Sequence, residues 1–180
     1  MLQWVTGQHG ALLHQFDSAA PDVHNNLLAR TAFAVILAEH PQHETQATTL
    51  IADVAAQAYE TRSPLSLGAA AILASVSPDQ RSTETTETLR QIIEPFRGSA
   101  IVPGAALSHL GPASLSLARL MTDGAAREEL LRQAVAEADQ WNLRLWSVIS
   151  LRDLAVATND ESFAEAARIR AAGSQLEMLL

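Results

Sequence analysis

Apolar residues recur along this chain with the spacing of amphipathic α-helices. The clearest case lies between residues 47 and 58, where apolar side chains fall at intervals of three and four and polar side chains face the other way. Residues 32–38 are apolar on every side, which is typical of a helix buried between neighbours. No segment alternates with the period of two that a half-buried strand requires. The pattern therefore predicts an all-α protein.

Turn and capping residues divide this pattern into about nine helices. Ser63 followed by Pro64 is expected to open a helix, with the serine as N-cap and the proline in the first turn. Ser77-Pro78-Asp79-Gln80 has the form of a capping box, and Asn142 stands where a left-handed C-cap belongs. The expected helices cover residues 2–16, 22–39, 47–58 and their flanks, 64–75, a segment reaching 96, 103–121, 125–141, 143–157 and 162–172.

The stretch from Glu94 to Met121 departs most from plain helix. Pro95 ends one helix, a turn follows at Gly98, and an Ala-rich segment then runs toward Pro112. Because proline cannot donate a backbone hydrogen bond, Pro112 either kinks the helix expected over 103–121 or splits it.

Short connections of three to six residues predict antiparallel helix hairpins, and stacked hairpins form an α-solenoid. The hairpins recur near the ~34–40 residues of tetratricopeptide-like repeats. The repeat signature is degenerate, because Arg127 occupies a position that should be small. We therefore expect one helical-repeat domain over residues 1–180, a tetratricopeptide-like α-solenoid. Residues 22–180 supply its hairpins, and residues 1–18 are a capping helix or the tail of a segment removed upstream.

Composition excludes several classes of function. Only 4% of the residues are aromatic, so the core must be built from Ala, Leu, Ile and Val. The formal charge is −8, and the twelve basic residues, all Arg, are scattered singly. A protein that binds nucleic acid directly needs a basic stripe, so we do not expect one here. The chain has no Cys, which excludes disulfides and thiolate sites.

The chain carries no recognisable targeting or membrane segment. Its first residues lack the basic region and cleavage site of a signal peptide. No apolar run approaches the ~18 residues that a membrane helix needs. We expect a cytoplasmic protein without membrane association.

The sequence offers little catalytic or metal chemistry. His40 and His43, with Glu39 and Glu44, form the closest cluster of potential ligands, but a Pro-containing junction separates them. A zinc site needs three or four convergent ligands, so we expect neither a metal nor a cofactor. No nucleophile elbow or catalytic triad is recognisable, and we expect no enzyme.

Three residues are candidates for ligand or partner binding: His109, Arg144 and Trp146. His109 sits in an apolar part of the expected helix over 103–121, where it bonds to a nearby carbonyl or contacts a ligand. Arg144 and Trp146 open the helix over 143–157. Trp146 packs between hairpins and Arg144 caps the carbonyls of the preceding helix, or the two line a partner-binding groove.

Several spaced residues carry a resemblance to a known family. Pro95, Phe96 and Gly98 match a Pro-aromatic-x-Gly turn, while Gly104, Ala105 and Gly111 match the Gly-Ala helix that follows it. Arg144 and Trp146 match a later junction, in which Asn142 replaces Gly and Leu145 replaces Pro. The chain from about Asp22 to Leu180 thus resembles the C-terminal tetratricopeptide-like region of large bacterial signal-transduction ATPases, the LuxR-type and activator-type regulators. It has neither their P-loop nor a basic helix-turn-helix.

The resemblance implies the repeat module of such a regulator, either excised or standing alone. We expect a non-catalytic regulatory or protein-interaction scaffold that binds a protein partner or a neighbouring domain, or forms a homodimer. The alternative is a sensing domain that holds a small-molecule effector in its concave face.

Overall fold

The computed structural model describes residues 25–103 and 109–179 of the 180-residue chain. Throughout these ranges the regular structure is helical, with one isolated bridge between Ala100 and Pro112. The prediction of an all-α protein is therefore confirmed, while the expected helix over 2–16 lies outside the described residues. Two compact units divide the chain: unit 1 comprises 25–92 with Pro103, and unit 2 comprises 93–102 and 109–179. The single domain over 1–180 stays a prediction, and each unit is described by itself.

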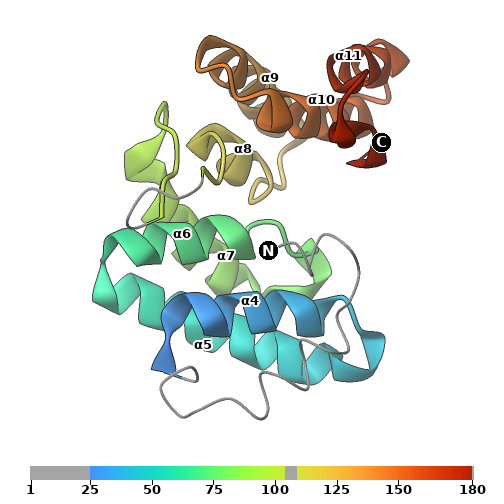
Figure 1. Ribbon diagram of the computed structural model, residues 1–180. Helices are drawn as coiled ribbons and strands as arrows, with labels where there is room; N and C mark the ends of the chain where they lie inside the picture. Colours follow the sequence, from blue (N-terminus) through green and yellow to red (C-terminus); the bar gives the residue numbers. More distant parts are fainter. Residues whose placement is uncertain (1–24, 104–108, 180) are drawn as a thin grey trace. The chain divides into compact units, whose positions relative to one another are not determined.

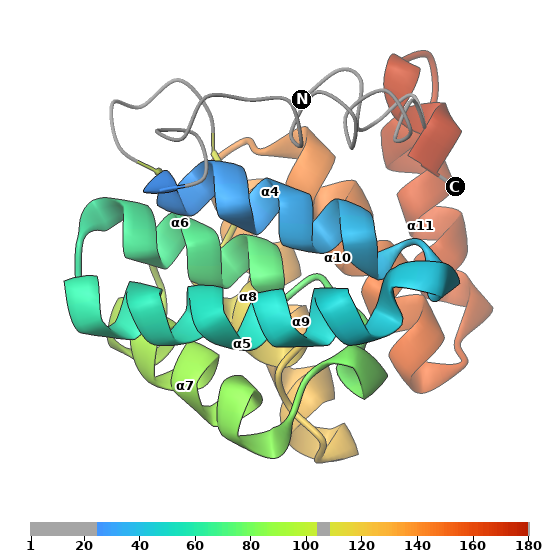
Figure 2. The ribbon, with the colours of Figure 1, turned by 90° about the horizontal axis from the view of Figure 1, so that it is seen from below.

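Unit 1 is a group of α-helices joined by short connections, two of which contain a 3₁₀ turn. Its elements are α4 (Leu27–Ala38), η1 (Pro41–His43), α5 (Glu44–Thr61), α6 (Pro64–Leu73), η2 (Pro78–Gln80) and α7 (Thr83–Ile93), whose last residue belongs to unit 2. α4, α5 and α6 pack against one another, side by side in Figures 1 and 2. The apolar run predicted to be buried forms the core of α4, where Phe33 to Leu37 are all buried.

Helix capping in unit 1 agrees with the sequence-based prediction at Ser63 and differs from it at Ser77. Ser63 and Ser66 form a reciprocal capping box, and Pro64 is the first residue of α6. The box expected at Ser77 is wrong, because the Ser77 hydroxyl bonds to the Asp79 carboxylate and only a 3₁₀ turn forms. Gln80 instead donates to the Ala38 carbonyl oxygen at 2.7 Å, at the end of α4.

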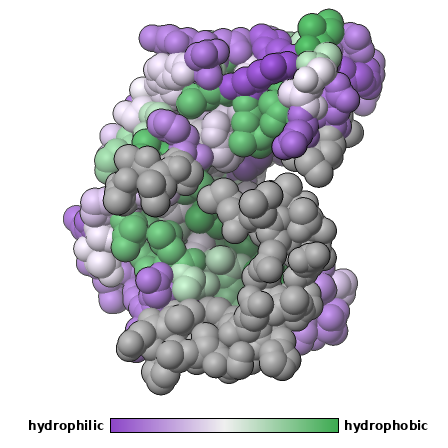
Figure 3. All heavy atoms as spheres, viewed as in Figure 1, coloured by the Kyte–Doolittle hydropathy of each residue, from purple (hydrophilic) through white to green (hydrophobic). Residues whose placement is uncertain are grey.

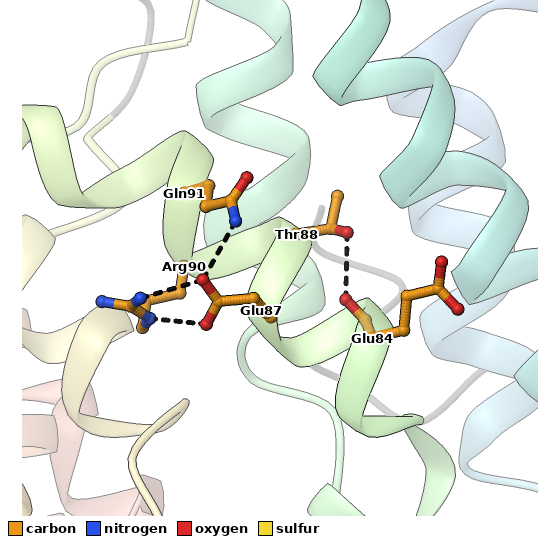
Figure 4. Close-up of polar contacts among 5 residues, drawn as sticks. All are labelled: Glu84, Glu87, Thr88, Arg90 and Gln91. Atoms are coloured by element: carbon orange, nitrogen blue, oxygen red, sulfur yellow. Dashed lines mark hydrogen bonds and ion pairs between the residues drawn. The ribbon is translucent and has the colours of Figure 1, made fainter.

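The polar start of α7 is helical, although its sequence, rich in Thr and Glu, gives no apolar stripe there. Ser82 caps it, since the Ser82 hydroxyl accepts from the Thr85 N–H at 3.0 Å. Further along, the Glu87 carboxylate accepts from Arg90 at 2.8 and 2.9 Å and from Gln91 at 3.0 Å (Figure 4). These hydrogen bonds, that of Arg90 first, lower the pKa of Glu87 from 4.5 to about 2.

The lowered pKa of Glu87 predicts that the local stability of α7 depends on pH. The folded-state pKa of Glu87 lies below its unfolded value, so its stabilisation of α7 is present above about pH 4.5 and is lost as pH falls toward 2. A carbon-detected NMR titration should give a Glu87 midpoint near pH 2, rising toward 4.5 in the Arg90→Ala variant. An unchanged midpoint in that variant would show that Arg90 does not hold the carboxylate.

Unit 2 consists of helices that pack in chain order. Its elements are η3 (Glu94–Phe96), α8 (Ala113–Ala118), α9 (Gly124–Gln140), α10 (Arg144–Thr158), α11 (Glu161–Ala171) and η4 (Gln175–Leu179). α10 packs against both α9 and α11, and α8 packs against α9 (Figures 1 and 2). Small residues let these helices approach closely: Ala134, Ala138 and Ala167 are fully buried beside Leu131 and Leu154.

The single helix expected over 103–121 is wrong for the part that the structure describes. α8 begins only at Ala113, directly after Pro112, and the described residues just before it, 109–112, are not helical. Any helix before the proline would fall on 104–108, outside the described residues, so neither a kink nor a split is observed. The preceding backbone pairs with an earlier segment instead: Ile101 N–H donates to the Gly111 carbonyl at 2.9 Å, and Leu110 N–H to the Ile101 carbonyl at 2.8 Å. Gly111 has a φ of 87°, a left-handed conformation that ends any helix approaching Pro112.

Two buried serines on α10 make a matched pair. The Ser147 hydroxyl donates to Asp139 Oδ1 at 2.6 Å, while the fully buried Ser150 hydroxyl has no hydrogen-bond partner among the described residues. A buried hydroxyl without a partner is destabilising, and alanine is the better helix former.

We expect Ser150→Ala to raise the free energy of unfolding by about 1 kcal/mol, and Ser147→Ala to lower it by about 1.5 kcal/mol. Urea denaturation followed by circular dichroism measures both. If Ser150→Ala is as destabilising as Ser147→Ala, the hydroxyl of Ser150 has a partner that the structure does not describe.

Candidate binding site

The ends of three helices meet on one side of unit 2. α9 stops at a left-handed Asn142, whose φ is 55°, as the sequence predicted. Leu143 N–H donates to the Ala138 carbonyl at 2.8 Å, and Asn142 N–H donates to the Asp139 carbonyl at 3.1 Å. This pair of bonds is the Schellman motif, and it leaves α10 to start at the next residue, Arg144.

Arg144 caps a helix, but not the one expected. Its Nε donates to the Arg170 carbonyl at 2.6 Å and its Nη2 to the Ala172 carbonyl at 3.0 Å, both at the end of α11. The prediction that Arg144 caps the preceding helix is wrong because the Schellman motif already serves the α9 carbonyls there. The antiparallel course of α10 and α11 brings a different set of orphan carbonyls to the guanidinium.

A second polar link joins the same three helices. The Asp139 carboxylate of α9 accepts from Ser147 of α10 at 2.6 Å and from Arg170 of α11 at 2.7 Å. Partial burial favours a higher pKa for Asp139, but the hydrogen bonds from Arg170 and Ser147 outweigh it and lower the pKa below the usual 3.8. Asp139 is therefore ionised at neutral pH and keeps the ends of the helices together.

A shallow hollow of about 330 Å³ lies at this junction. Its lining mixes charge with apolar surface: Ala138, Asp139, Asn142, Leu143, Arg144, Ser147, Ile169 and Arg170. Ile169 is 68% exposed beside these charged groups. In Figure 3 the region over α9–α11 is largely hydrophilic, with small apolar patches among the polar atoms. An exposed aliphatic side chain with arginines around it is a surface suited to a protein partner.

Trp146 and His109 stand apart from the hollow. Trp146 is half-buried and covers Gly111, where an added Cβ would lie 2.7 Å from two carbons of the indole ring. It thus packs α10 against the turn before α8. His109 is exposed and lies outside any helix, so the expectation of a partly buried His in an apolar helix is wrong. No interaction joins His109 to Arg144 or Trp146 in the ranges that the structure describes.

The double cap of Arg144 has a measurable consequence. We expect Arg144→Ala to lower the free energy of local opening at the end of α11 by about 1 kcal/mol, because two carbonyls lose an exposed charged donor. Amide hydrogen exchange at residues 172–175 should quicken about fivefold, and Arg144→Lys should recover little of the protection, since an ammonium lacks the planar fork. Exchange that is unchanged in Arg144→Ala would contradict the cap.

Unit 1 carries a larger cavity that the sequence did not single out. It is an open groove of about 620 Å³ between α4 and the first part of α5 with η1. Its lining comprises Arg30, Phe33, Gln42, His43, Thr45, Gln46, Thr49, Leu50 and Asp53. Gln46, Thr49 and Asp53 follow the i, i+3, i+7 spacing of one helix face, which was the available signal. Asp53 is one of the polar side chains that the periodicity between residues 47 and 58 places opposite the apolar stripe.

The histidine cluster considered from sequence does not gather ligands. His40 and His43 lie edge to face with ring centroids 6.4 Å apart. In residues 25–103 and 109–179, no group of three or more His, Asp or Glu side chains is placed to hold a metal ion. None of the helices in those ranges combines the length and apolar character needed to cross a bilayer.

Comparison of the chain with protein-family models, with curated proteins and with solved structures finds no match to any of them.

Proposed function

We propose that the chain is the helical-repeat module of a bacterial signal-transduction or transcription regulator, acting in the cytoplasm as a non-catalytic scaffold. Its hairpins are proposed to continue as a tetratricopeptide-like solenoid that binds a protein partner, a neighbouring domain or a second copy. The observation that carries the proposal is the junction of α9, α10 and α11, where the exposed Ile169 borders a hollow rimmed by Arg144, Arg170 and Asp139.

Two further observations support it. α9, α10 and α11 run up, down and up, because the start of α10 bonds to the end of α11 and the end of α11 bonds to the end of α9. This is the packing order of helical hairpins in a repeat array. Gly98, which the family resemblance places in a turn, has a left-handed backbone with a φ of 80°. Gly111, which the resemblance places in a helix, lies outside one, and Gly104 and Ala105 lie outside the described residues.

A photocrosslinking experiment tests the scaffold function. A benzophenone amino acid replaces Ile169 in one variant and Val156 in another, since both aliphatic side chains are well exposed, at 68% and 74%, but only Ile169 lines the hollow. After expression in a bacterial host, we expect a defined crosslinked partner from position 169 and none from 156. Equal, diffuse crosslinking from both positions would refute the proposal, and a covalent dimer would identify the partner as a second copy.

The groove in unit 1 favours a second function, the sensing of a small-molecule effector. Its volume of about 620 Å³ lies within the range of small-molecule sites, roughly 300–1,000 Å³. Phe33 and Leu50 contribute apolar surface, and polar side chains of both helices line the remainder. Thermal-shift screening with amino acids, sugars and nucleosides tests this function, and uniformly zero shifts would refute it.

A further inference from the structure

The α4–α5 groove holds two opposite charges on facing helices. Arg30 comes from α4 and Asp53 from α5, and both line the cavity. The Arg30 guanidinium donates through Nη1 to Gln57 Oε1 at 2.5 Å, one helical turn from Asp53 along α5. No ion pair joins Arg30 to Asp53 among the described residues. A ligand therefore meets a cation and an anion in the same groove.

The remaining lining limits the ligand further. Thr45, Thr49, Gln42 and Gln46 offer hydroxyl and amide groups, which bind neutral polar atoms. Leu50 is half-buried and, with Phe33, supplies an apolar surface. A purely anionic ligand would face Asp53 and the net charge of −8, while a purely cationic one would face Arg30.

We propose that this groove binds a zwitterion with an aliphatic side chain, an amino acid or a dipeptide. Its carboxylate pairs with the guanidinium of Arg30, its ammonium pairs with Asp53, and its side chain lies on Leu50. Bidentate recognition of a carboxylate is the geometry that arginine favours. The inference rests on the second function proposed above and is independent of the partner surface on unit 2.

Calorimetric titration of the full chain tests the proposal with four probes. L-leucine and L-leucyl-L-leucine carry both charges, isopentylamine lacks the carboxylate and 4-methylpentanoate lacks the ammonium. We expect one of the two zwitterions to bind, and both single-charge analogues to bind at least about fivefold more weakly. The comparison of leucine with leucyl-leucine distinguishes the amino acid from the dipeptide.

Charge-neutral variants assign the two contacts. Arg30→Gln should weaken zwitterion binding about tenfold, since Arg30 is partly buried, and Asp53→Asn about fivefold, since Asp53 is exposed. Glu60→Gln removes another exposed carboxylate of α5 outside the groove and should leave binding unchanged. The same variants must retain the wild-type circular dichroism spectrum.

Four outcomes would overturn the inference. Equal binding of 4-methylpentanoate and leucine would show an anion site, and equal losses in Asp53→Asn and Glu60→Gln would show that Asp53 makes no contact. If no zwitterion binds while a sugar or nucleoside shifts the melting temperature, effector sensing stands and the ligand class is wrong. If none of the compounds shifts the melting temperature, both the zwitterion site and the effector-sensing function are wrong.

Discussion

Replacing Gly111 with alanine should lower the free energy of unfolding of unit 2 by about 3 kcal/mol. Two costs combine at this position. Its φ of 87° is a conformation that costs an L-residue roughly 1–2 kcal/mol. The new Cβ would also lie 2.7 Å from two indole carbons of Trp146, so the ring or the turn must move, and such overpacking typically costs ~1–3 kcal/mol.

Two other glycines separate these costs. Gly173 also has a positive φ, 71°, but a Cβ there meets nothing within 4 Å, so Gly173→Ala should lose only about 1 kcal/mol. Gly124 opens α9 with an ordinary φ and free space, so Gly124→Ala should be neutral or slightly stabilising. Urea denaturation of the three variants gives the series, and equal losses in Gly111→Ala and Gly173→Ala would show that Trp146 does not press on this turn.

A double-mutant cycle makes the test independent of the backbone cost. Trp146→Leu removes the indole ring and should be destabilising by itself, because the half-buried ring covers the turn. In that background Gly111→Ala should cost about 1–2 kcal/mol less than in the wild type. If the free-energy losses of the two substitutions are additive, the whole cost of Gly111→Ala comes from its backbone conformation and none from contact with Trp146.

The second large effect should come from Asp153, which links α10 to α8. Its Oδ2 accepts a hydrogen bond from Arg119 Nε at 2.9 Å and forms an ion pair with Nη2 at 2.8 Å. The side chains of Asp153 and Arg119 are only 15% and 20% exposed. Because this pair is largely withdrawn from water, its loss costs more than that of a surface pair. We expect Asp153→Ala to lower the free energy of unfolding by about 2 kcal/mol.

Glu128 provides the matched control for this prediction. It pairs with Arg132 at 2.7 Å within α9, but both side chains are well exposed, at 40% and 49%. Glu128→Ala should cost no more than about 0.5 kcal/mol. Raising the salt concentration to 1 M should reduce the effect of Glu128→Ala more than that of Asp153→Ala. Equal losses at both positions would mean that the burial of the Arg119 pair contributes nothing.

The sequence pattern predicts a helix correctly where the contacts that begin or end it are local in sequence. The helices at α6 and α9 were predicted within a few residues, because Ser63 and Asn142 act on backbone groups three to five positions away. The helix over 103–121 failed for the opposite reason. Its sequence is apolar enough for a helix, but Ile101 pairs with Gly111 across ten positions, and helical periodicity does not predict such pairing.

The candidate sites show the same difference between local contacts, which the sequence predicts, and long-range contacts, which it does not. Arg144 was predicted to cap carbonyls, which its residue type and position indicate, but its partners lie 26 and 28 positions away on α11. Only the packing of α10 on α11 decides which carbonyls those are. The placement of Arg30 and Asp53 along the same groove likewise depends on the register between α4 and α5, which the residue spacing within either helix does not give.

The indole ring that covers Gly111 belongs to one of two tryptophans in unit 2, which make this unit optically distinct. Trp141 and Trp146 both belong to unit 2, and unit 1 has only Tyr59 and Phe33 among its described aromatic side chains other than histidine. In a Trp4→Phe background, indole fluorescence therefore follows unit 2 alone, while circular dichroism follows the helices of both units. Two spectra recorded in one denaturation experiment then report whether the units unfold together or one after the other.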